Sequence, residues 1–189
     1  MGKAKKIMIL GAGSLQIPIM LEARSMGLEV ITASVAGNYP GFEVADRSFI
    51  VDVRKQERIL AIAKNLKIDA IITDQTDIPV KTAAYVAEKL GLPGIGIECA
   101  KWFTDKFQMR KKCESIGIPV PKYFKAVTIE EAYKASKEID FPVIVKPVDS
   151  QGSRGVKKVD NFVQLEHAFK DALKYSANGS VIVEEYFKG

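Results

Sequence analysis

The sequence predicts an α/β fold that begins with a parallel sheet covered by helices on both faces and continues into a smaller α+β unit on an antiparallel sheet. Three observations predict it. Short apolar runs alternate with helical patterns from residue 6 to about residue 93, as is typical of a parallel sheet. Pro119 and Pro121 then exclude regular structure, because each lacks a backbone donor. Beyond them the rhythm changes, and two strands flank a glycine-rich loop.

The first half is expected to contain four strands and three helices. The run KIMIL is apolar throughout, as a strand buried on both faces should be. Gly27 and Gly91 end two of the helices, and Pro18 is compatible with a helix only near its first turn. The expected strands are 6–10, 28–33, 48–53 and 68–73, and the expected helices run to about Met26, from 55 to 67 and from 78 to 90.

The second half is expected to mix helices with antiparallel strands. Thr128 and Glu131, three residues apart, form a capping box that starts a helix. Helices are expected at 98–115, 128–139 and 162–175, and strands near 122–126 and at 142–147, 155–159 and 180–186. We place the domain boundary between residues 93 and 120, which gives a domain at 1–94, a helical linker region at 95–120 and a second domain at 121–189.

The composition is that of a soluble globular protein, with 47% apolar and 27% charged residues. The chain shows neither an apolar run of about 20 residues, the length that spans a bilayer, nor an export signal, so we expect a cytoplasmic protein whose cysteines, Cys99 and Cys113, are free thiols. The single histidine, His167, argues against zinc and against a Ser-His-Asp triad. The net charge of +5 comes from lysines spread over the helices, so neither nucleic acid nor a membrane is expected as a partner.

The turn GAGS after the first strand contains Gly11 and Gly13, which fit the start of a dinucleotide-binding fingerprint. Gln16 stands where the fingerprint has its third Gly or Ala, and the second strand ends without an acidic residue for a ribose hydroxyl. NAD is therefore disfavoured. A tight strand-to-helix turn and a substrate-anion site at the helix N-terminus both remain open. In the second case the binding residues would be Gly11, Gly13, Ser14 and Leu15.

A second polar stretch, TDQTD, lies just beyond the fourth strand. Ligands of open α/β sheets bind outside the carboxyl ends of the strands, so Thr76 and Asp77 could contact a substrate. They could equally serve as turn or helix-cap residues, because Asp and Thr favour both roles.

The stretch VKPVDSQGSRGV indicates an anion site. Lys146 ends an apolar strand, and Pro147 fixes the exit from it. Gly152 and Gly155 allow backbone angles at which N–H groups converge on an anion, and Arg154 adds a planar donor suited to phosphate. An ordinary hairpin turn would explain the glycines but not the pairing of a lysine with an arginine.

Two further stretches are ambiguous alone. Lys106 lies on an expected helix and could be a simple surface lysine. The ending SVIVEEYFKG reads either as a last strand with exposed acids or as a strand entering a linker with its backbone only partly paired. In the second interpretation, the segment offers a carbonyl and an N–H group to the edge of a purine.

Together and in this order, these stretches resemble the ATP-grasp superfamily of ATP-dependent carboxylate–amine ligases. The likeness covers the whole chain: a Rossmann-like pre-ATP-grasp domain with a G-x-G turn, a first cationic residue, a lysine in VKP, a glycine-rich loop and the acidic strand VEE. The stretches EVADRSFIVDV and VKPVDSQGSRG are similar to the branch that contains the carbamoyl phosphate synthase large subunit, formate-dependent glycinamide ribonucleotide transformylase and the phosphoribosylaminoimidazole carboxylase ATPase subunit.

The resemblance implies roles for individual residues. Lys106 and Lys146 would contact the phosphates of ATP, Glu184 and Glu185 would meet the adenine amino group, Glu185 through its carbonyl, and Phe187 would offer its backbone N–H. The mobile loop closing over the phosphates would consist of Ser150, Gln151, Gly152, Ser153, Arg154 and Gly155. Residues 121–189 would then be the first ATP-grasp subdomain, and the chain would end before the C-terminal subdomain.

The resemblance also has departures. The transformylase carries acidic residues where this chain has Ser14 and Thr76, so the likeness does not carry glycinamide ribonucleotide over as the substrate. No Glu-x-Asn magnesium motif is present, and the Mg²⁺ ligands are expected downstream. The implied activity is ligation of a small carboxylate and an amine through an acyl phosphate, and the 189-residue chain alone is expected to be inactive. A non-catalytic nucleotide-binding or interaction module is the alternative, an NAD-dependent oxidoreductase is a weaker one, and a homodimer stays open.

Overall fold

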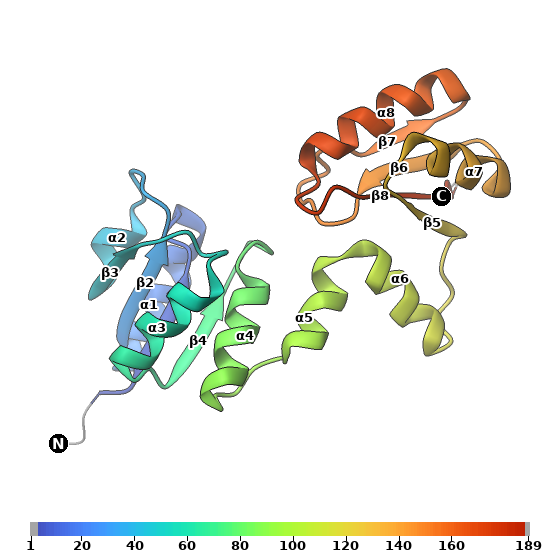
Figure 1. The fold of residues 1–189 in the computed structure, drawn as a ribbon. Helices are drawn as coiled ribbons and strands as arrows, with labels where there is room; N and C mark the ends of the chain where they lie inside the picture. Colours follow the sequence, from blue (N-terminus) through green and yellow to red (C-terminus); the bar gives the residue numbers. More distant parts are fainter. Residues whose placement is uncertain (1–3, 188–189) are drawn as a thin grey trace. The chain divides into compact units, whose positions relative to one another are not determined.

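The computed structural model describes residues 4–187 of the chain. It divides into two compact units, Met1–Ala100 and Lys101–Gly189, which we call the N-terminal and the C-terminal unit. Each unit is built on its own four-stranded sheet (Figure 1). Within residues 4–187, no helix combines the length with the apolar character needed to cross a lipid bilayer.

The sheet of the N-terminal unit is parallel throughout, as predicted. Its strands are β1 (Lys6–Leu10), β2 (Glu29–Ser34), β3 (Arg47–Ile50) and β4 (Ala70–Thr73), in the order β3-β2-β1-β4. β1 lies between two neighbours, and Met8, Ile9 and Leu10 on it are completely buried. This placement explains its continuous apolar run, because a strand covered on both faces has no side that favours polar residues.

Helices cover both faces of this sheet. Met8 and Leu10 belong to a core that also contains Ile59 and Val86 from the helices on that face. The intervening side chains on β1 pack with Met20 of the helix on the other face. The elements are the 3₁₀ turn η1 (Ser14–Gln16), α1 (Ile17–Ser25), α2 (Gly41–Val44), α3 (Gln56–Leu66) and α4 (Val80–Leu90). Pro18 lies in the first turn of α1, and Gly91 ends α4 with a φ of 65°.

Two features of the N-terminal unit differ from the sequence prediction. The third strand ends at Ile50 rather than at residue 53, and the helix α2 was not predicted. At the start of α2, Gly41 donates to the carbonyl of Ala12 at 2.8 Å, and a Cβ there would lie 2.7 Å from that oxygen. Only glycine fits this close approach. The position of α2 is therefore fixed by a contact across 29 residues of sequence, and a local sequence pattern cannot predict such a contact.

The predicted helix at 98–115 is two helices, α5 (Ile97–Thr104) and α6 (Lys106–Ser115). Asp105 separates them, with extended backbone angles of −131° and 113°. Its carboxylate accepts a hydrogen bond from the Gln108 backbone N–H at 3.0 Å and so caps α6. Aspartate favours this N-cap role, which is why the chain breaks at this residue.

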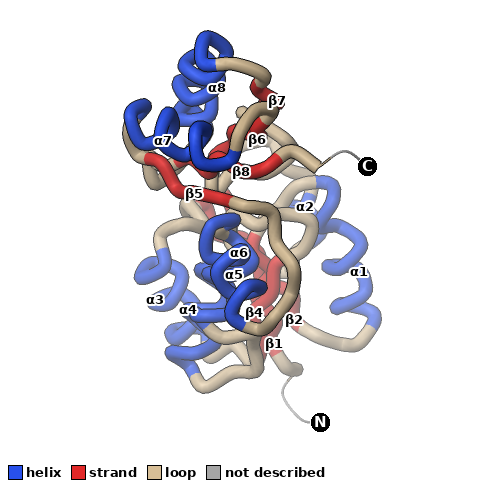
Figure 2. Tube along the Cα trace, turned by 90° about the vertical axis from the view of Figure 1, so that its right-hand side faces the viewer, coloured by secondary structure: helices blue, strands red, loops and turns tan. Residues whose placement is uncertain are grey.

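The C-terminal unit holds an antiparallel sheet, as predicted. Its strands are β5 (Tyr123–Ala126), β6 (Val143–Pro147), β7 (Lys157–Val159) and β8 (Val181–Glu185), in the order β5-β8-β6-β7. Two helices, α7 (Ile129–Ile139) and α8 (Phe162–Tyr175), lie on one face (Figure 2). Thr128 and Glu131 form the predicted capping box, and α8 spans the residues predicted for it.

The last strand corrects one expectation. β8 is not a partly paired strand entering a linker but a central strand of the sheet. Glu184 lies opposite Tyr123 of β5 and Ile144 of β6, and the Glu185 N–H donates to the carbonyl of Lys122 at 2.9 Å. The sequence did not show this because both neighbours of β8 come from distant parts of the chain.

Candidate functional site

The antiparallel sheet places Lys146 and Glu184 on one face. Side chains alternate along a strand, so Val145 of β6 and Val183 of β8 point into the core with α7 and α8, and their neighbours point to the opposite face. Lys146 pairs with Ile182 and Glu184 pairs with Ile144, so the two charged residues are diagonal neighbours. The Lys146 ammonium donates to Oε1 of Glu184, and their side chains are 14% and 7% exposed.

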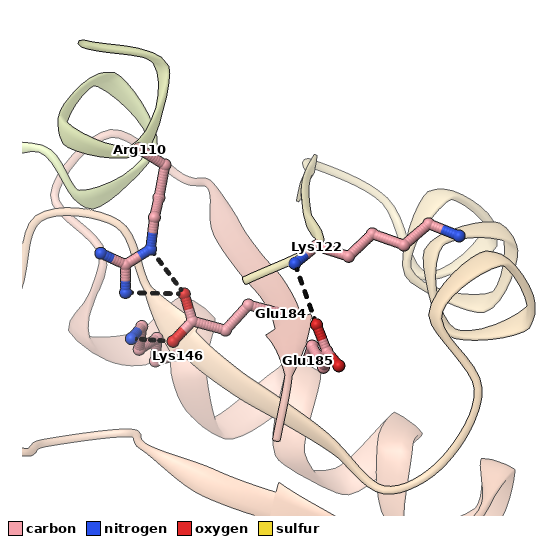
Figure 3. Close-up of polar contacts among 5 residues, drawn as sticks. All are labelled: Arg110, Lys122, Lys146, Glu184 and Glu185. Atoms are coloured by element: carbon pink, nitrogen blue, oxygen red, sulfur yellow. Dashed lines mark hydrogen bonds and ion pairs between the residues drawn. The ribbon is translucent and has the colours of Figure 1, made fainter. Parts of the chain in front are cut away.

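A third charged residue completes this group, which we call the Glu184 cluster: Arg110, Lys146 and Glu184. Arg110 lies on α6, and its Nε and Nη2 donate to Oε2 of Glu184 at 3.2 and 3.1 Å. Figure 3 shows both cations converging on the one carboxylate. The cluster therefore carries a formal excess of one positive charge on a mostly buried face of the sheet.

This excess charge is what makes the cluster a candidate anion site. A buried carboxylate is stable only when its charge is compensated, and either cation alone would balance Glu184. An ammonium has three donors, of which Lys146 directs one at Glu184. An incoming phosphate could therefore bind Lys146 while Arg110 keeps Glu184 neutralised, and charge-assisted contacts of this kind are strong.

The structure brings Lys106 to the glycine-rich loop. Its backbone N–H donates to the carbonyl of Val148 at 2.8 Å, and its ammonium donates to the carbonyl of Ser150 at 2.6 Å. Lys106 and Arg110 are one helical turn apart on α6, so they lie on the same side of that helix. One helix thus contacts both the loop and the Glu184 cluster. Lys106 is half-buried and tied to the loop rather than fully solvated, and its contact with phosphate stays a prediction.

The loop from Ser150 to Gly155 follows β6 and has the expected backbone freedom. Gly152, Ser153 and Gly155 have positive φ angles of 62°, 55° and 70°. Gly155 is buried, and a Cβ there would lie 2.9 Å from Cδ2 of Tyr175. The tip is exposed, including Arg154, whose Nε donates to the carbonyl of Gln151 at 3.2 Å. The loop is therefore packed at its end and open to solvent at its tip.

Glu185 and Phe187 lie apart from the Glu184 cluster. The Glu185 carboxylate accepts a hydrogen bond from the Lys122 N–H at 3.3 Å and lies away from Lys146 (Figure 3). Phe187 follows β8 and is 63% exposed. The contacts predicted for these two residues are made with adenine and use backbone atoms. The position of the Glu185 side chain does not test them, so they stay predictions.

A cavity of about 740 Å³ lies beside β5. It includes Glu185 but none of the Glu184 cluster, and it is lined by Phe107, Glu114, Val120, Pro121, Lys122, Tyr123, Phe124, Lys125 and Glu185. Burial and a hydrogen bond to Glu114 at 2.9 Å raise the pKa of Tyr123 to about 12. The phenol of Tyr123 therefore ionises at a higher pH than an ordinary tyrosine.

In the N-terminal unit, Gln16 joins the two stretches predicted to bind a substrate. Its Oε1 accepts the Gly13 N–H at 3.1 Å, and its Nε2 donates to the carbonyl of Asp74 at 2.6 Å. Its side chain is buried. The Gln16 side chain therefore occupies the Gly13 N–H, a donor that the phosphate of a dinucleotide would need. This contact is a physical reason why NAD is disfavoured as a ligand.

The predicted substrate residues of the two stretches lie at one edge of the parallel sheet. β1 and β4 are neighbours in this sheet, and both stretches follow the carboxyl ends of these strands. Gly11 has a φ of 109°, Ser14, Leu15 and Asp77 are exposed, and Thr76 is half-buried.

Sequence reasoning missed Arg110 and the part played by Gln16. A signal for Arg110 was present, because it follows Lys106 by four residues, the spacing of neighbours on a helix. Gln16 was noted only as a departure from a glycine fingerprint. Among residues 4–187, no group of three or more His, Cys, Asp and Glu side chains could hold a metal ion.

Comparison with known proteins identifies the family of the C-terminal unit. Residues 105–189 match the family model described as the ATP-binding domain of the carbamoyl-phosphate synthase L chain. The match begins at Asp105, the cap of α6, and includes every residue of the Glu184 cluster and the loop.

Curated relatives match nearly the whole chain. The formate-dependent phosphoribosylglycinamide formyltransferase of Methanocella arvoryzae is 35% identical over 185 residues, which cover 96% of this chain and 43% of the relative. The protein of the same name from Saccharolobus solfataricus is 31% identical, with coverage of 98% and 47%. The chain thus spans about half the length of the curated relatives it matches.

Solved structures with a similar fold also match nearly the whole chain. The N5-carboxyaminoimidazole ribonucleotide synthetase of Thermotoga maritima is 27% identical with a TM-score of 0.73, covering 97% of this chain and 46% of that one. The N5-carboxyaminoimidazole synthetase of Staphylococcus aureus, complexed with ADP, is 20% identical with a TM-score of 0.79, covering 100% and 49%, and shows the fold alone.

The parallel-sheet unit and the antiparallel-sheet unit together share the fold of the matched part of the Thermotoga maritima synthetase, 46% of its length. The C-terminal unit thus matches an ATP-binding domain of the kind found in the ATP-grasp superfamily, and the whole chain is similar to proteins of that superfamily, as its motifs indicated.

Proposed function

We propose that this chain is the N-terminal portion of an ATP-dependent carboxylate–amine ligase and that its C-terminal unit binds part of ATP. The observation that carries the proposal is the Glu184 cluster, which holds two cations beside a glycine-rich loop within the segment that matches an ATP-binding domain. In such a ligase ATP phosphorylates a carboxylate, and a nucleophile then displaces phosphate from the acyl phosphate. Fixed cations favour the step by offsetting charge on the transferred phosphoryl group.

In this proposal each predicted site residue has one task. Lys146 and Lys106 contact phosphate oxygens, and Arg110 keeps the charge of Glu184 compensated when Lys146 turns to the nucleotide. The loop of Ser150, Gln151, Gly152, Ser153, Arg154 and Gly155 closes over the phosphates. Glu184 and the carbonyl of Glu185 meet the adenine amino group, and the Phe187 N–H meets the ring.

The division of the chain follows from the same proposal. Residues 1–94 form a Rossmann-like pre-ATP-grasp domain, residues 95–120 a helical linker region, and residues 121–189 the first ATP-grasp subdomain. We propose that Mg²⁺ accompanies ATP and that its ligands lie downstream of the residues described here, because the sequence has no Glu-x-Asn motif.

The substrates are proposed by class only. The edge of the parallel sheet, with Gly11, Gly13, Ser14, Leu15, Thr76 and Asp77, would bind a small-molecule substrate, because ligands of such sheets bind at the carboxyl ends of strands. The relatives named formate-dependent phosphoribosylglycinamide formyltransferase favour a small carboxylate and an amine. Ser14 and Thr76 are neutral, which argues against the amine used by those relatives.

Two measurements on the full-length protein test the proposal. Calorimetric titration with ATP and Mg²⁺ should show saturable binding. A panel of small carboxylates, incubated with ATP and hydroxylamine, should yield a hydroxamate with at least one acid, because hydroxylamine traps acyl phosphates. Failure to bind ATP or ADP would refute the nucleotide site. Binding without a hydroxamate or ADP release for any acid would instead favour a non-catalytic nucleotide-binding module.

A further inference from the structure

Asp149 links the start of the glycine-rich loop to a distant turn. It lies two residues after β6, and its carboxylate accepts hydrogen bonds from the turn between α8 and β8. The Ala177 N–H donates to Oδ1 at 3.1 Å and the Asn178 N–H to Oδ2 at 3.0 Å. The Ser176 hydroxyl also donates to Oδ1, at 3.1 Å. Both carboxylate oxygens are therefore engaged by the same short turn, 27 to 29 residues away in sequence.

The residue before Asp149 is also fixed. The Val148 N–H donates to the carbonyl of Ser180 at 3.3 Å, and its carbonyl accepts from the Lys106 N–H at 2.8 Å. Val148 and Ser180 are completely buried. The chain therefore reaches the loop with its backbone and its first side chain already tied to the unit.

The far end of the loop rests on the same part of the unit. Gly155 is buried where a Cβ would lie 2.9 Å from Cδ2 of Tyr175 and 3.1 Å from Cα of Ala172, both near the end of α8. Between these two ends, residues 152–154 are exposed. The loop is thus held at both ends by the C-terminal part of α8 and the turn that follows it, and its tip is free of that packing.

The contacts suit a carboxylate, because both of its oxygens can accept hydrogen bonds. Two backbone N–H groups and a hydroxyl converge on Asp149, each as a donor. An asparagine could accept at only one oxygen, because its amide nitrogen would bring a second donor against a donor. Hydrogen bonds to a charged acceptor are roughly twice as strong as neutral ones, so Asp should hold this turn better than Asn.

We propose that Asp149 is a positioning residue that fixes where the loop leaves β6, and therefore where the loop donors stand relative to Lys146. It acts through the loop and needs no contact with nucleotide. The inference rests on the proposed function for its effect on phosphate binding, but the anchor itself can be tested without any ligand.

The test compares Asp149→Asn with Asp171→Asn in the full-length protein. Asp171 is a matched control because it is also on the α8 side of the unit but pairs only with Lys174 among the contacts described, at 3.5 Å. Without nucleotide, amide hydrogen exchange at Ala177 and Asn178 should accelerate about tenfold or more in Asp149→Asn, equivalent to about 1.4 kcal/mol, and should not change in the control.

The second readout separates positioning from general destabilisation. ATP affinity, measured well below the unfolding temperature, should fall about tenfold in Asp149→Asn, whereas adenosine affinity should not change, because the loop serves the phosphates. Equal losses for ATP and adenosine would overturn the positioning role. If Asp149→Asn does not fold, Ser176→Ala should show the same pattern at smaller size; it removes one donor to Asp149 together with the acceptor of the Ser180 N–H.

The two possible failures are distinguishable. Unchanged exchange at Ala177 and Asn178 would refute the Asp149 anchor and leave the proposed function intact. If the unaltered protein binds neither ATP nor ADP, the proposed function is wrong, and the phosphate part of this inference is wrong with it.

Discussion

Replacing Lys146 by alanine should weaken ATP binding much more than it destabilises the fold. In the structure the ammonium of Lys146 donates to Glu184, and both side chains are mostly buried. Under the proposed function, ATP offers a phosphate to the same ammonium. The substitution removes that contact, and the resulting change in affinity can be worked out separately from the change in stability.

The affinity change follows from the contact that is lost. A hydrogen bond to a charged group contributes roughly 1.5–3 kcal/mol, and about 1.4 kcal/mol corresponds to tenfold in affinity. The dissociation constant of ATP should therefore rise about tenfold to a hundredfold in Lys146→Ala. The same substitution at Lys64, which is exposed on α3, should change it by less than about twofold.

The stability change depends on Arg110. In Lys146→Ala, Glu184 keeps the two hydrogen bonds from Arg110 at 3.2 and 3.1 Å, so the carboxylate stays compensated. In the double variant Lys146→Ala/Arg110→Ala, a buried carboxylate is left without a partner, which costs about 3–5 kcal/mol. The double variant should thus lose more stability than the sum of the single variants, by about 1 kcal/mol or more.

Calorimetric titration with ATP and Mg²⁺ measures the affinities, and urea denaturation of the same variants measures the free energies of unfolding. Equal ATP affinity in Lys146→Ala and Lys64→Ala would show that Lys146 is an ordinary strand-end lysine. Additive losses of stability in the double variant would refute the idea that either cation alone can compensate the charge of Glu184.

Three further predictions concern single groups in the C-terminal unit. Gly155→Ala should reduce the free energy of unfolding, measured in urea, by about 1–3 kcal/mol or more, because alanine at a φ of 70° would be strained and would also crowd Tyr175. Gly152→Ala, at a position with open space around it, should reduce it less. A larger loss in Gly152→Ala than in Gly155→Ala would contradict the packing described. In an ultraviolet titration, one tyrosine should ionise near pH 12, because the pKa of Tyr123 is raised from 10.0 to about 12; the folded state should lose stability as pH rises through that interval, and an unchanged late transition in Tyr123→Phe would disprove the assignment. Thr128→Ala should cost about 0.5–2 kcal/mol through loss of the cap on α7, and an unchanged urea midpoint would count against the capping box.

Local patterns were sufficient to predict most of the fold. Apolar alternation and capping signals are properties of neighbouring residues, so Phe162–Tyr175 and the capped start of α7 could be predicted from the sequence. The break at Asp105 was missed because the residues around it are dense in charge and carry no clear apolar period that an interruption would disturb.

Some parts of the candidate site could be predicted from local sequence and others could not. Lys146 and the glycine-rich loop are adjacent in the sequence, and together they indicate an anion site. Arg110 and Glu184 are 74 residues apart, and their contact exists only because β8 returns to the middle of the sheet. The Asp149 contacts likewise depend on a turn that begins 27 residues later, so no local pattern could report them.

The central position of β8 has a consequence for synthesis of the protein on the ribosome. β5 pairs with β8 alone in the sheet, and β8 also pairs with β6. β5 therefore has no strand to pair with until residues 181–185 have left the exit tunnel. The N-terminal unit, whose four strands are complete by Thr73, can fold much earlier, because domains generally fold as units in the order of synthesis. We expect the nascent C-terminal unit to keep unpaired strand edges, accessible to chaperones and proteases, until β8 has been synthesised.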